Sequence, residues 1–244
     1  GFIFRFFYSF LNNNWYYFLY GIIGFLVAFV LGYGLYYTKQ WGGGDTKLLM
    51  GLGIIFATKP FFSEDNLFLL NLFLNIFITG SIYGILYGAY LAINNKNSFL
   101  GEFKKLLSEK NIVFIKKLVF LISGISLFLL LVTKDLGTRF ILIGFAFLLI
   151  IYLYLWIFVK AVENACMFKT IQVDKLVEGD WVTEDVLVNN KVIYSHRKLA
   201  VDRKDILKFI GAGVKKVRIK DGIPFVPSFL IGTLLTLIFG SLFY

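Results

Sequence analysis

The chain has 244 residues, of which 58% are hydrophobic, 19% aromatic and only 16% charged, with a mean hydropathy of +0.76. A soluble fold cannot bury that much apolar surface, and a disordered chain would be far poorer in apolar residues. The net charge of +10 in such a chain is typical of basic cytoplasmic loops rather than of a nucleic-acid-binding surface. We therefore expect an integral membrane protein in contact with the lipid bilayer, without a nucleic-acid partner. The single Cys166 and the single His196 exclude a disulfide framework and a His/Cys metal cage.

The chain begins at Gly1, without Met, in the apolar stretch GFIFRFFYSFL. A secretory signal peptide would show a basic start, a short apolar run and a small-residue cleavage site, none of which is present. We therefore expect residues 1–11 to be the end of an upstream element, and the sequence to be a fragment that lacks its upstream part.

A membrane-spanning helix needs about 20 mostly apolar residues. Five segments meet this requirement, namely 16–38, 67–93, 117–133, 139–160 and 224–244. Residues 46–62 form a shorter apolar run that ends near Pro60, so this segment is either a short helix or partly re-entrant. The predicted fold class is an all-α polytopic membrane bundle of about six transmembrane helices, with a small cytoplasmic α+β insert before the last helix.

The distribution of Lys and Arg predicts the orientation of the spans. Loop 94–116 and segment 161–223 are rich in basic residues, whereas 12–15, 63–66 and 134–138 are nearly free of them. Because cytoplasmic loops carry the excess of Lys and Arg, the first two should be cytoplasmic and the other three should lie outside. Residues 39–45 then face the cytoplasm.

Residues 166–222 are the part of the chain with a soluble character. The stretches VTEDVLV and KVIYS have the composition of strands, and VKKVRIK at 214–220 alternates as a half-buried strand does. Asp202 is a suitable N-cap for a helix over 203–210. We divide the chain into a membrane core (1–165), a small cytoplasmic α+β module (166–222) and a final span (223–244).

An aspartate follows three glycines, Gly42, Gly43 and Gly44, at the predicted cytoplasmic entry of an apolar helix. Glycines allow backbone conformations and close approaches that other residues cannot reach, and here they would bring the carboxylate of Asp45 to the mouth of the bundle. A carboxylate at such a place is by default a candidate functional group. Two such groups could share a proton, one activating water while the other protonates a leaving amine. Asp45 could equally be only a helix cap, because aspartate favours helix N-termini.

Two separate motifs resemble one family. GGGDTKLLMGLG, which begins at Gly42, resembles the second-aspartate motif G-x-G-D-x-K of the type IV prepilin peptidases, and KDGIPFVPSFLIG (220–232) resembles the C-terminal signature of their archaeal, preflagellin-peptidase branch. LVEGDWVTEDV (176–186) precedes the second motif in a similar context. Presenilin-type proteases share G-x-G-D, but their downstream Pro-Ala-Leu motif is absent here.

The resemblance implies a membrane-embedded aspartic endopeptidase without metal or organic cofactor. Its substrates would be prepilin or preflagellin-like proteins, each with a basic leader and an apolar helix, cut on the cytoplasmic side of the cell membrane. Asp45 matches the family's second catalytic aspartate, and Gly42, Gly44 and Lys47 match other motif positions, while Gly43 occupies the variable position between them. Gly222, Pro224 and Pro227 open the last span and are candidates for a substrate groove.

One departure concerns the first catalytic aspartate, which the family places on an early helix before the glycines. Residues 1–44 contain no Asp or Glu. We therefore expect the partner of Asp45 either to lie upstream or to have been lost. The alternative functions are a catalytically inactive homologue and a non-enzymatic membrane assembly or transport component.

Overall fold

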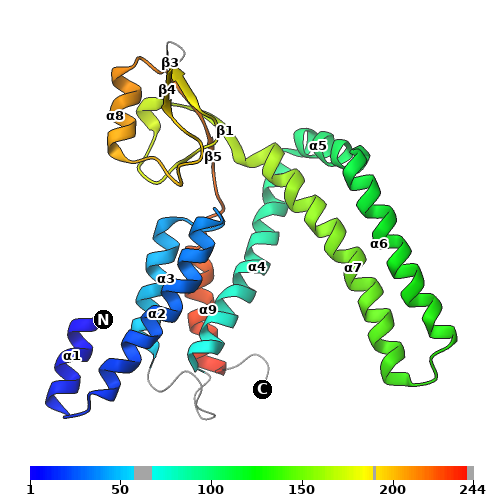
Figure 1. The fold of residues 1–244 in the computed structure, drawn as a ribbon, viewed down its shortest axis with the longest axis horizontal. Helices are drawn as coiled ribbons and strands as arrows, with labels where there is room; N and C mark the ends of the chain where they lie inside the picture. Colours follow the sequence, from blue (N-terminus) through cyan, green and yellow to red (C-terminus); the bar gives the residue numbers. More distant parts are fainter. Residues whose placement is uncertain (58–67, 189–190, 241–244) are drawn as a thin grey trace. The chain divides into compact units, whose positions relative to one another are not determined.

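The computed structural model describes residues 1–57, 68–188 and 191–240. It is mostly helical, with small sheets near the C-terminal end of the chain (Figure 1). The described chain forms two compact units. The first joins Gly1–Leu86 to Thr170–Tyr244, and the second is Tyr87–Lys169. Each unit is described by itself.

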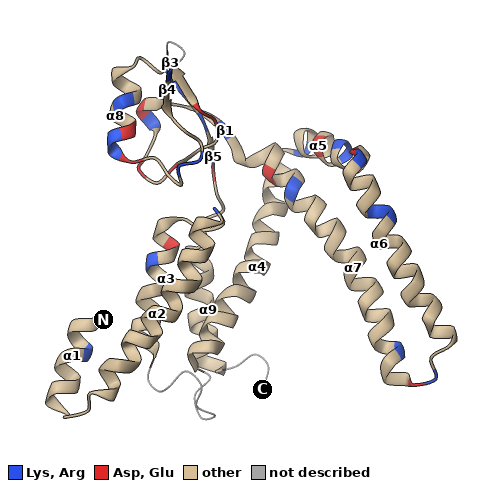
Figure 2. Cartoon of the chain, in the orientation of Figure 1, with Lys and Arg blue, Asp and Glu red and all other residues tan. Residues whose placement is uncertain are grey.

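Four predicted spans are confirmed as helices long and apolar enough to cross a membrane. They are α2 (Tyr16–Tyr37), α4 (Phe68–Asn94), α6 (Lys110–Phe128) and α7 (Leu136–Val162). α2 and α4 contain no charged residue, and Figure 2 shows most of the Lys, Arg, Asp and Glu on the sheet region, on α5 (Lys96–Ser108), on the first half of α6 and near other helix ends.

Three other apolar helices are shorter, namely α1 (Phe2–Leu11), α3 (Gly43–Phe56) and α9 (Val226–Phe239). α3 and α9 have 14 residues each, and such a helix is about 21 Å long where the hydrocarbon core is about 30 Å thick. The predicted count of six spans is therefore not confirmed. Pro60, the predicted outer loop 63–66 and residues 241–244 of the predicted last span lie outside the described residues.

α2 and α3 pack closely through small residues. The buried residues of α2 are Gly21, Gly24, Ala28 and Gly32. A Cβ atom added to Gly24 would lie 2.3 Å from the carbonyl oxygen of Gly53 on α3, so the two backbones approach as only glycines permit. This seam fixes α3 against the longer α2.

α9 packs against α4 through a polar seam. The Asn75 side-chain amide donates to the hydroxyl of Thr236 at 2.9 Å, and the Thr79 hydroxyl donates to the carbonyl of Ser228 at 3.1 Å. A Cβ at Gly232 would lie 2.6 Å from the Cα of Ile76. Small residues and interhelical hydrogen bonds are the usual means of helix association in lipid, and here they hold α9 at a defined place on α4 along its length.

The C-terminal module contains the predicted strands and helix. Its elements are β1 (Phe168–Gln172), the 3₁₀ turn η3 (Val173–Lys175), β2 (Trp181–Val182), β3 (Val186–Val188), β4 (Lys191–Tyr194), α8 (Arg203–Gly211) and β5 (Lys216–Lys220). The strand order is β1-β5-β2, with β2 and β5 antiparallel, and β3 and β4 form a separate antiparallel pair. Phe209 of α8 is wholly buried in the module's apolar core, which also contains Val182, Tyr194 and Val217.

Asp202 caps α8 as predicted, accepting the backbone N–H of Asp205 at 2.9 Å. Lys198 donates to both carboxylates. The hydrogen bond from Lys198 lowers the pKa of Asp202 to about 2, and burial is the main reason that the pKa of Tyr194 rises to about 12. Lys198 therefore ties the loop before α8 to the first turn of this helix.

The second unit contains α5, α6, α7, the 3₁₀ turn η1 (Leu129–Leu131) and the π turn η2 (Glu163–Met167). Residues 94–116, expected to be a loop, are largely helical, and α6 begins at Lys110 rather than at 117. The reason is amphipathicity, because Phe103, Leu106 and Leu107 of α5 pack into a core with α7 while its lysines remain exposed.

Candidate functional site

The predicted motif forms the N-terminus of α3. Gly42 is the N-cap, and the carboxylate of Asp45 reaches back to accept the backbone N–H of Gly42 at 3.3 Å. An acidic side chain at this position satisfies a free helix donor and interacts favourably with the helix dipole. Asp45 is partly exposed, so its carboxylate both caps the helix and remains accessible.

The three glycines were expected to adopt backbone conformations that other residues cannot reach, but their backbone is ordinary. Gly42 has φ −74° and ψ 160°, and neither Gly43 nor Gly44 has a positive φ. A Cβ at Gly44 would meet no atom within 4 Å, and one at Gly42 would lie 3.5 Å from the nearer Asp45 oxygen. The glycines therefore leave open space around the first turn of α3 instead of providing a strained turn.

The residues after Asp45 have different surroundings. Thr46 is buried, and its hydroxyl is 3.2 Å both from the carbonyl oxygen of Gly32 on α2 and from that of Gly42. Lys47 is exposed. Thr46 thus anchors the first turn of α3 to α2, whereas Lys47 extends away from the packed interior.

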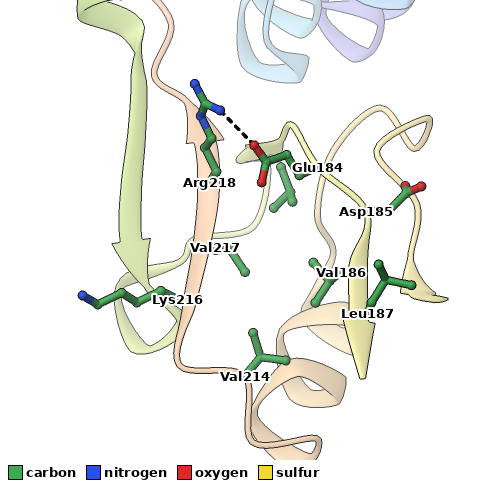
Figure 3. Close-up of a pocket in the computed structure, with 9 residues that line it drawn as sticks. Glu184, Asp185, Val186, Leu187, Val214, Lys216, Val217 and Arg218 are labelled. Atoms are coloured by element: carbon green, nitrogen blue, oxygen red, sulfur yellow. Dashed lines mark hydrogen bonds and ion pairs between the residues drawn. The ribbon is translucent and has the colours of Figure 1, made fainter. Parts of the chain in front are cut away.

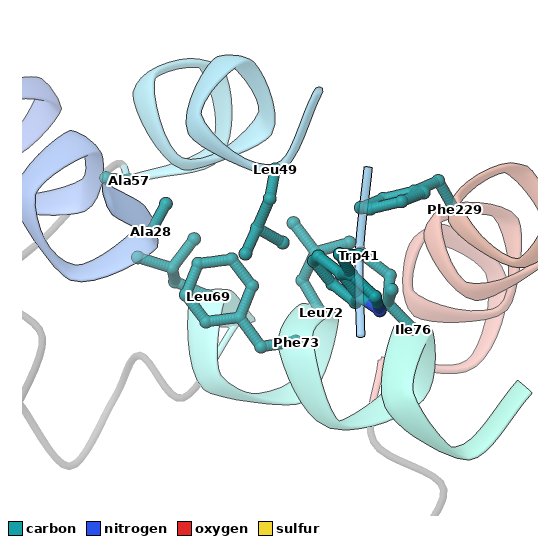
Figure 4. Close-up of a cluster of buried hydrophobic side chains, with 9 residues drawn as sticks. All are labelled: Ala28, Trp41, Leu49, Ala57, Leu69, Leu72, Phe73, Ile76 and Phe229. Atoms are coloured by element: carbon teal, nitrogen blue, oxygen red, sulfur yellow. The ribbon is translucent and has the colours of Figure 1, made fainter. Parts of the chain in front are cut away.

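Trp41, directly before the motif, is buried in an apolar cluster with residues of α3, α4 and α9. It lies among Leu72, Ile76 and Phe229 (Figure 4). Its ring centroid is 5.6 Å from that of Phe77 and 5.3 Å from that of Phe229. Aromatic pairs at such distances contribute about 0.5–1.5 kcal/mol beyond their buried area. The loop that leads into the motif is therefore fixed to α4 and α9.

The second predicted motif reaches the first through Phe225. Gly222 and Pro224 are exposed, and Pro227 lies in the first turn of α9. Phe225, between these prolines, packs on Trp41 with ring centroids 4.9 Å apart. The structure thus joins the glycine motif and the C-terminal segment through two aromatic rings. In the described residues, the hydrogen bond of Asp45 is with Gly42, and none links it to Gly222, Pro224 or Pro227.

The site also lies next to the module. Lys39, in the loop between α2 and α3, donates from its ammonium to the backbone carbonyl of His196 at 3.0 Å. His196 in turn contacts Asp185, with its Nδ1 2.8 Å from a carboxylate oxygen, and hydrogen bonds from His196 lower the pKa of Asp185. The loop before the motif is therefore tied to the basic module as well as to the helices.

A second carboxylate beside Asp45 is not found in the described chain, where the hydrogen bond to Asp45 comes from the backbone of Gly42. Within the same residues, no three His, Cys, Asp or Glu side chains gather as metal ligands would. The arrangement around Asp45 thus offers one accessible carboxylate and a bare helix start.

A surface hollow of about 230 Å³ lies on the module, between β5 and the stretch that leads into β3 (Figure 3). An ion pair between Arg218 and Glu184, 2.9 Å apart, lies at its edge. Its other lining residues are Val182, Asp185, Val186, Leu187, Val214, Lys216 and Val217. None of them belongs to either predicted motif, so the hollow is separate from the candidate site.

Sequence reasoning missed the roles of Arg5, Trp41 and Phe225. Arg5 is only 2% exposed and donates to the backbone carbonyls of Ile54 and Ile55 at the end of α3. A lone charge in an apolar stretch was the available signal for Arg5. Trp41 and Phe225 are far apart in the sequence, so no local pattern could predict that they pack against each other.

A comparison with known protein families gives a match for part of the chain. The model of the type IV leader peptidase family matches residues 1–88, which include α1, α2, α3 and the first part of α4. The resemblance noted for the glycine motif is thus confirmed for this part of the chain. Neither the comparison with curated proteins nor that with solved structures found a match.

Proposed function

We propose that the chain is a membrane-embedded aspartic endopeptidase that removes the leader of prepilin or preflagellin-like proteins on the cytoplasmic side. The observation that carries the proposal is Asp45 itself. It lies in the segment that matches the type IV leader peptidase family, its carboxylate is accessible at the start of α3, and the helix around it is bare. Its contact with Gly42 supports the proposal by fixing the carboxylate at one place.

The proposed reaction needs two carboxyl groups, one ionised and one protonated. The ionised group takes a proton from water as the water oxygen attacks the scissile carbonyl carbon, and the protonated group gives its proton to the leaving amide nitrogen as the C–N bond breaks. Asp45 supplies one group. Residues 1–44 contain no Asp or Glu, so the other must come from elsewhere, and a natural chain without it would be an inactive homologue.

The charge distribution supports a cytoplasmic position for this site. Segment 161–223 contains twelve Lys and Arg residues, and such excess marks the cytoplasmic side. The contact of Lys39 with His196 places the loop before the glycine motif beside that basic module. A leader peptide would be cut on this side, where the apolar helix of the substrate leaves the membrane.

The first test replaces Asp45 by asparagine in the natural full-length protein. Asparagine caps a helix almost as well as aspartate, so folding and expression should be retained. Cleavage of a prepilin-type substrate in membranes should fall by about 100-fold or more, because the carboxyl group that handles protons is gone. Unchanged processing, with the variant present at the wild-type level, would show that Asp45 is only a cap.

A second test asks whether the substrate approaches the carboxylate of Asp45 through the open space beside Gly42, at the start of α3. In Gly42→Ala the new methyl group would lie 3.5 Å from the Asp45 oxygen, at backbone angles that alanine adopts freely. We expect the variant to fold and cleavage to fall by about tenfold, because access to the reacting group is narrowed.

The matched control for this test is Gly43→Ala. Its methyl group would lie 3.8 Å from Cε2 of Tyr36, in ordinary contact and away from the carboxylate. Cleavage should stay close to that of the wild type. Equal activity of the two alanine variants would contradict substrate access over Gly42. A chain that never cleaves, yet supports assembly of a partner complex, would instead favour the non-enzymatic alternative.

A further inference from the structure

The ring of Phe225 packs against α4 at Gly80, where any side chain larger than hydrogen would clash with it. A Cβ atom at Gly80 would lie 2.0 Å from the ring carbon Cζ of Phe225 and 2.4 Å from Cε2. Gly80 is buried, and its lack of a side chain allows the ring to lie directly against the helix backbone. One turn further along α4, a Cβ at Gly84 would meet no atom within 4 Å.

The seated ring is the neighbour of Trp41. The two ring centroids are 4.9 Å apart, and Trp41 is itself only 6% exposed. The next residue is Gly42, whose backbone N–H holds the carboxylate of Asp45. A shift of the Phe225 ring would therefore move Trp41, and the backbone donor of Asp45 with it.

We infer that Phe225, seated on Gly80, is a positioning residue for Asp45 and acts through Trp41. This inference rests on the proposed function, because it assigns to the C-terminal segment a role in the same site. Phe225 fixes where the carboxylate lies without touching the substrate. Misplacing a reacting group by about 1 Å can cost about 100-fold in rate, so the anchor matters for turnover more than for substrate binding.

The test compares Gly80→Ala with its matched control Gly84→Ala in the full-length protein. In Gly80→Ala the methyl group displaces the Phe225 ring, so kcat for leader cleavage should fall by about tenfold or more while KM changes by less than about twofold. Gly84→Ala makes the same chemical change in open space and should retain wild-type kinetics. Equal kcat values for the two variants would overturn the inference.

A second pair of variants separates positioning from general damage. Phe225→Leu removes the ring, and adding Gly80→Ala to it should cost nothing further, because the clash no longer exists. Trp41→Phe keeps an aromatic contact and should retain most activity, whereas Trp41→Ala should lose it. Additive losses of kcat in the Gly80/Phe225 double variant would contradict the proposed contact.

A readout that does not require activity distinguishes this inference from the proposed function. Backbone amides of residues 42–46 should exchange hydrogen faster in Gly80→Ala than in Gly84→Ala, because the loop that carries Trp41 is loosened. If Gly80→Ala exchanges faster than Gly84→Ala but the wild-type protein cleaves no prepilin-type substrate, Phe225 still positions Asp45 and the proposed peptidase function is refuted. Cleavage by the wild type with identical exchange in both variants would refute the anchor alone.

Discussion

Gly53→Ala should lower the free energy of unfolding by about 2–3 kcal/mol, because overpacking at a rigid contact is costly. A Cβ atom at Gly53 would lie 2.4 Å from the carbonyl oxygen of Gly24 and 2.7 Å from Cβ of Ala28. The first of these neighbours is backbone, so it cannot rotate away, and α2 and α3 would have to separate. Unfolding of the purified protein in detergent, followed by circular dichroism, measures this loss.

Gly51→Ala in the same helix is the control, because a Cβ there meets no atom within 4 Å. Alanine favours a helix interior by about 1 kcal/mol over glycine, so this variant should be as stable as the wild type or slightly more stable. Gly24→Ala should resemble Gly53→Ala, since it acts on the same contact from α2. Similar stabilities of Gly51→Ala and Gly53→Ala would show that the helices do not meet as described.

The long spans and the module could be predicted because their signals are local. About 20 apolar residues in succession define a helix such as α2 or α4, and alternation of polar and apolar residues marks β5. Asp202 predicted the start of α8, because aspartate is a preferred N-cap residue. The helix α5 was missed because its lysines indicated a loop, although its apolar residues have helical spacing.

The candidate site was predicted only in part. Asp45 and its glycines form a contiguous motif, so their position at the start of a helix could be expected from the sequence. The packing of Phe225 on Trp41 depends on how α9 lies against α4. That arrangement comes from the seam of Asn75 and Thr236, whose partners lie far apart in the chain and cannot be paired from one sequence.

Both ends of the short helix α3 are held in place by side chains or backbone groups of other elements. At its start, Asp45 accepts the N–H of Gly42, and Thr46 bonds to α2. At its end, the 14-residue helix leaves carbonyl groups that have no donor within the helix itself. The side chain of Arg5 on α1 meets them there, as a cation at the negative end of the helix dipole.

Arg5→Met should therefore destabilise the protein by about 3 kcal/mol or more, since it removes three hydrogen bonds from a charged donor, each worth about 1.5–3 kcal/mol. Arg5 Nε donates to the Ile54 carbonyl at 2.5 Å, one terminal nitrogen to Tyr17 at 2.6 Å and the other to Ile55 at 3.1 Å. Methionine fills a similar volume but donates nothing. Arg5→Lys should be intermediate, because an ammonium lacks the planar fork that reaches several carbonyls at once.

Arg139→Met is the matched control for Arg5→Met, since Arg139 also donates to a backbone carbonyl, that of Thr133 at 2.8 Å, but is exposed. Water can replace this donor, so the free energy of unfolding should change by less than about 0.5 kcal/mol. Unfolding in detergent measures both variants. If Arg5→Met and Arg139→Met were equally stable, Arg5 would not cap α3. The cleavage activity of Arg5→Met should fall only as far as the amount of folded protein falls. In that case Arg5 supports the helix that carries Asp45 and has no separate catalytic role.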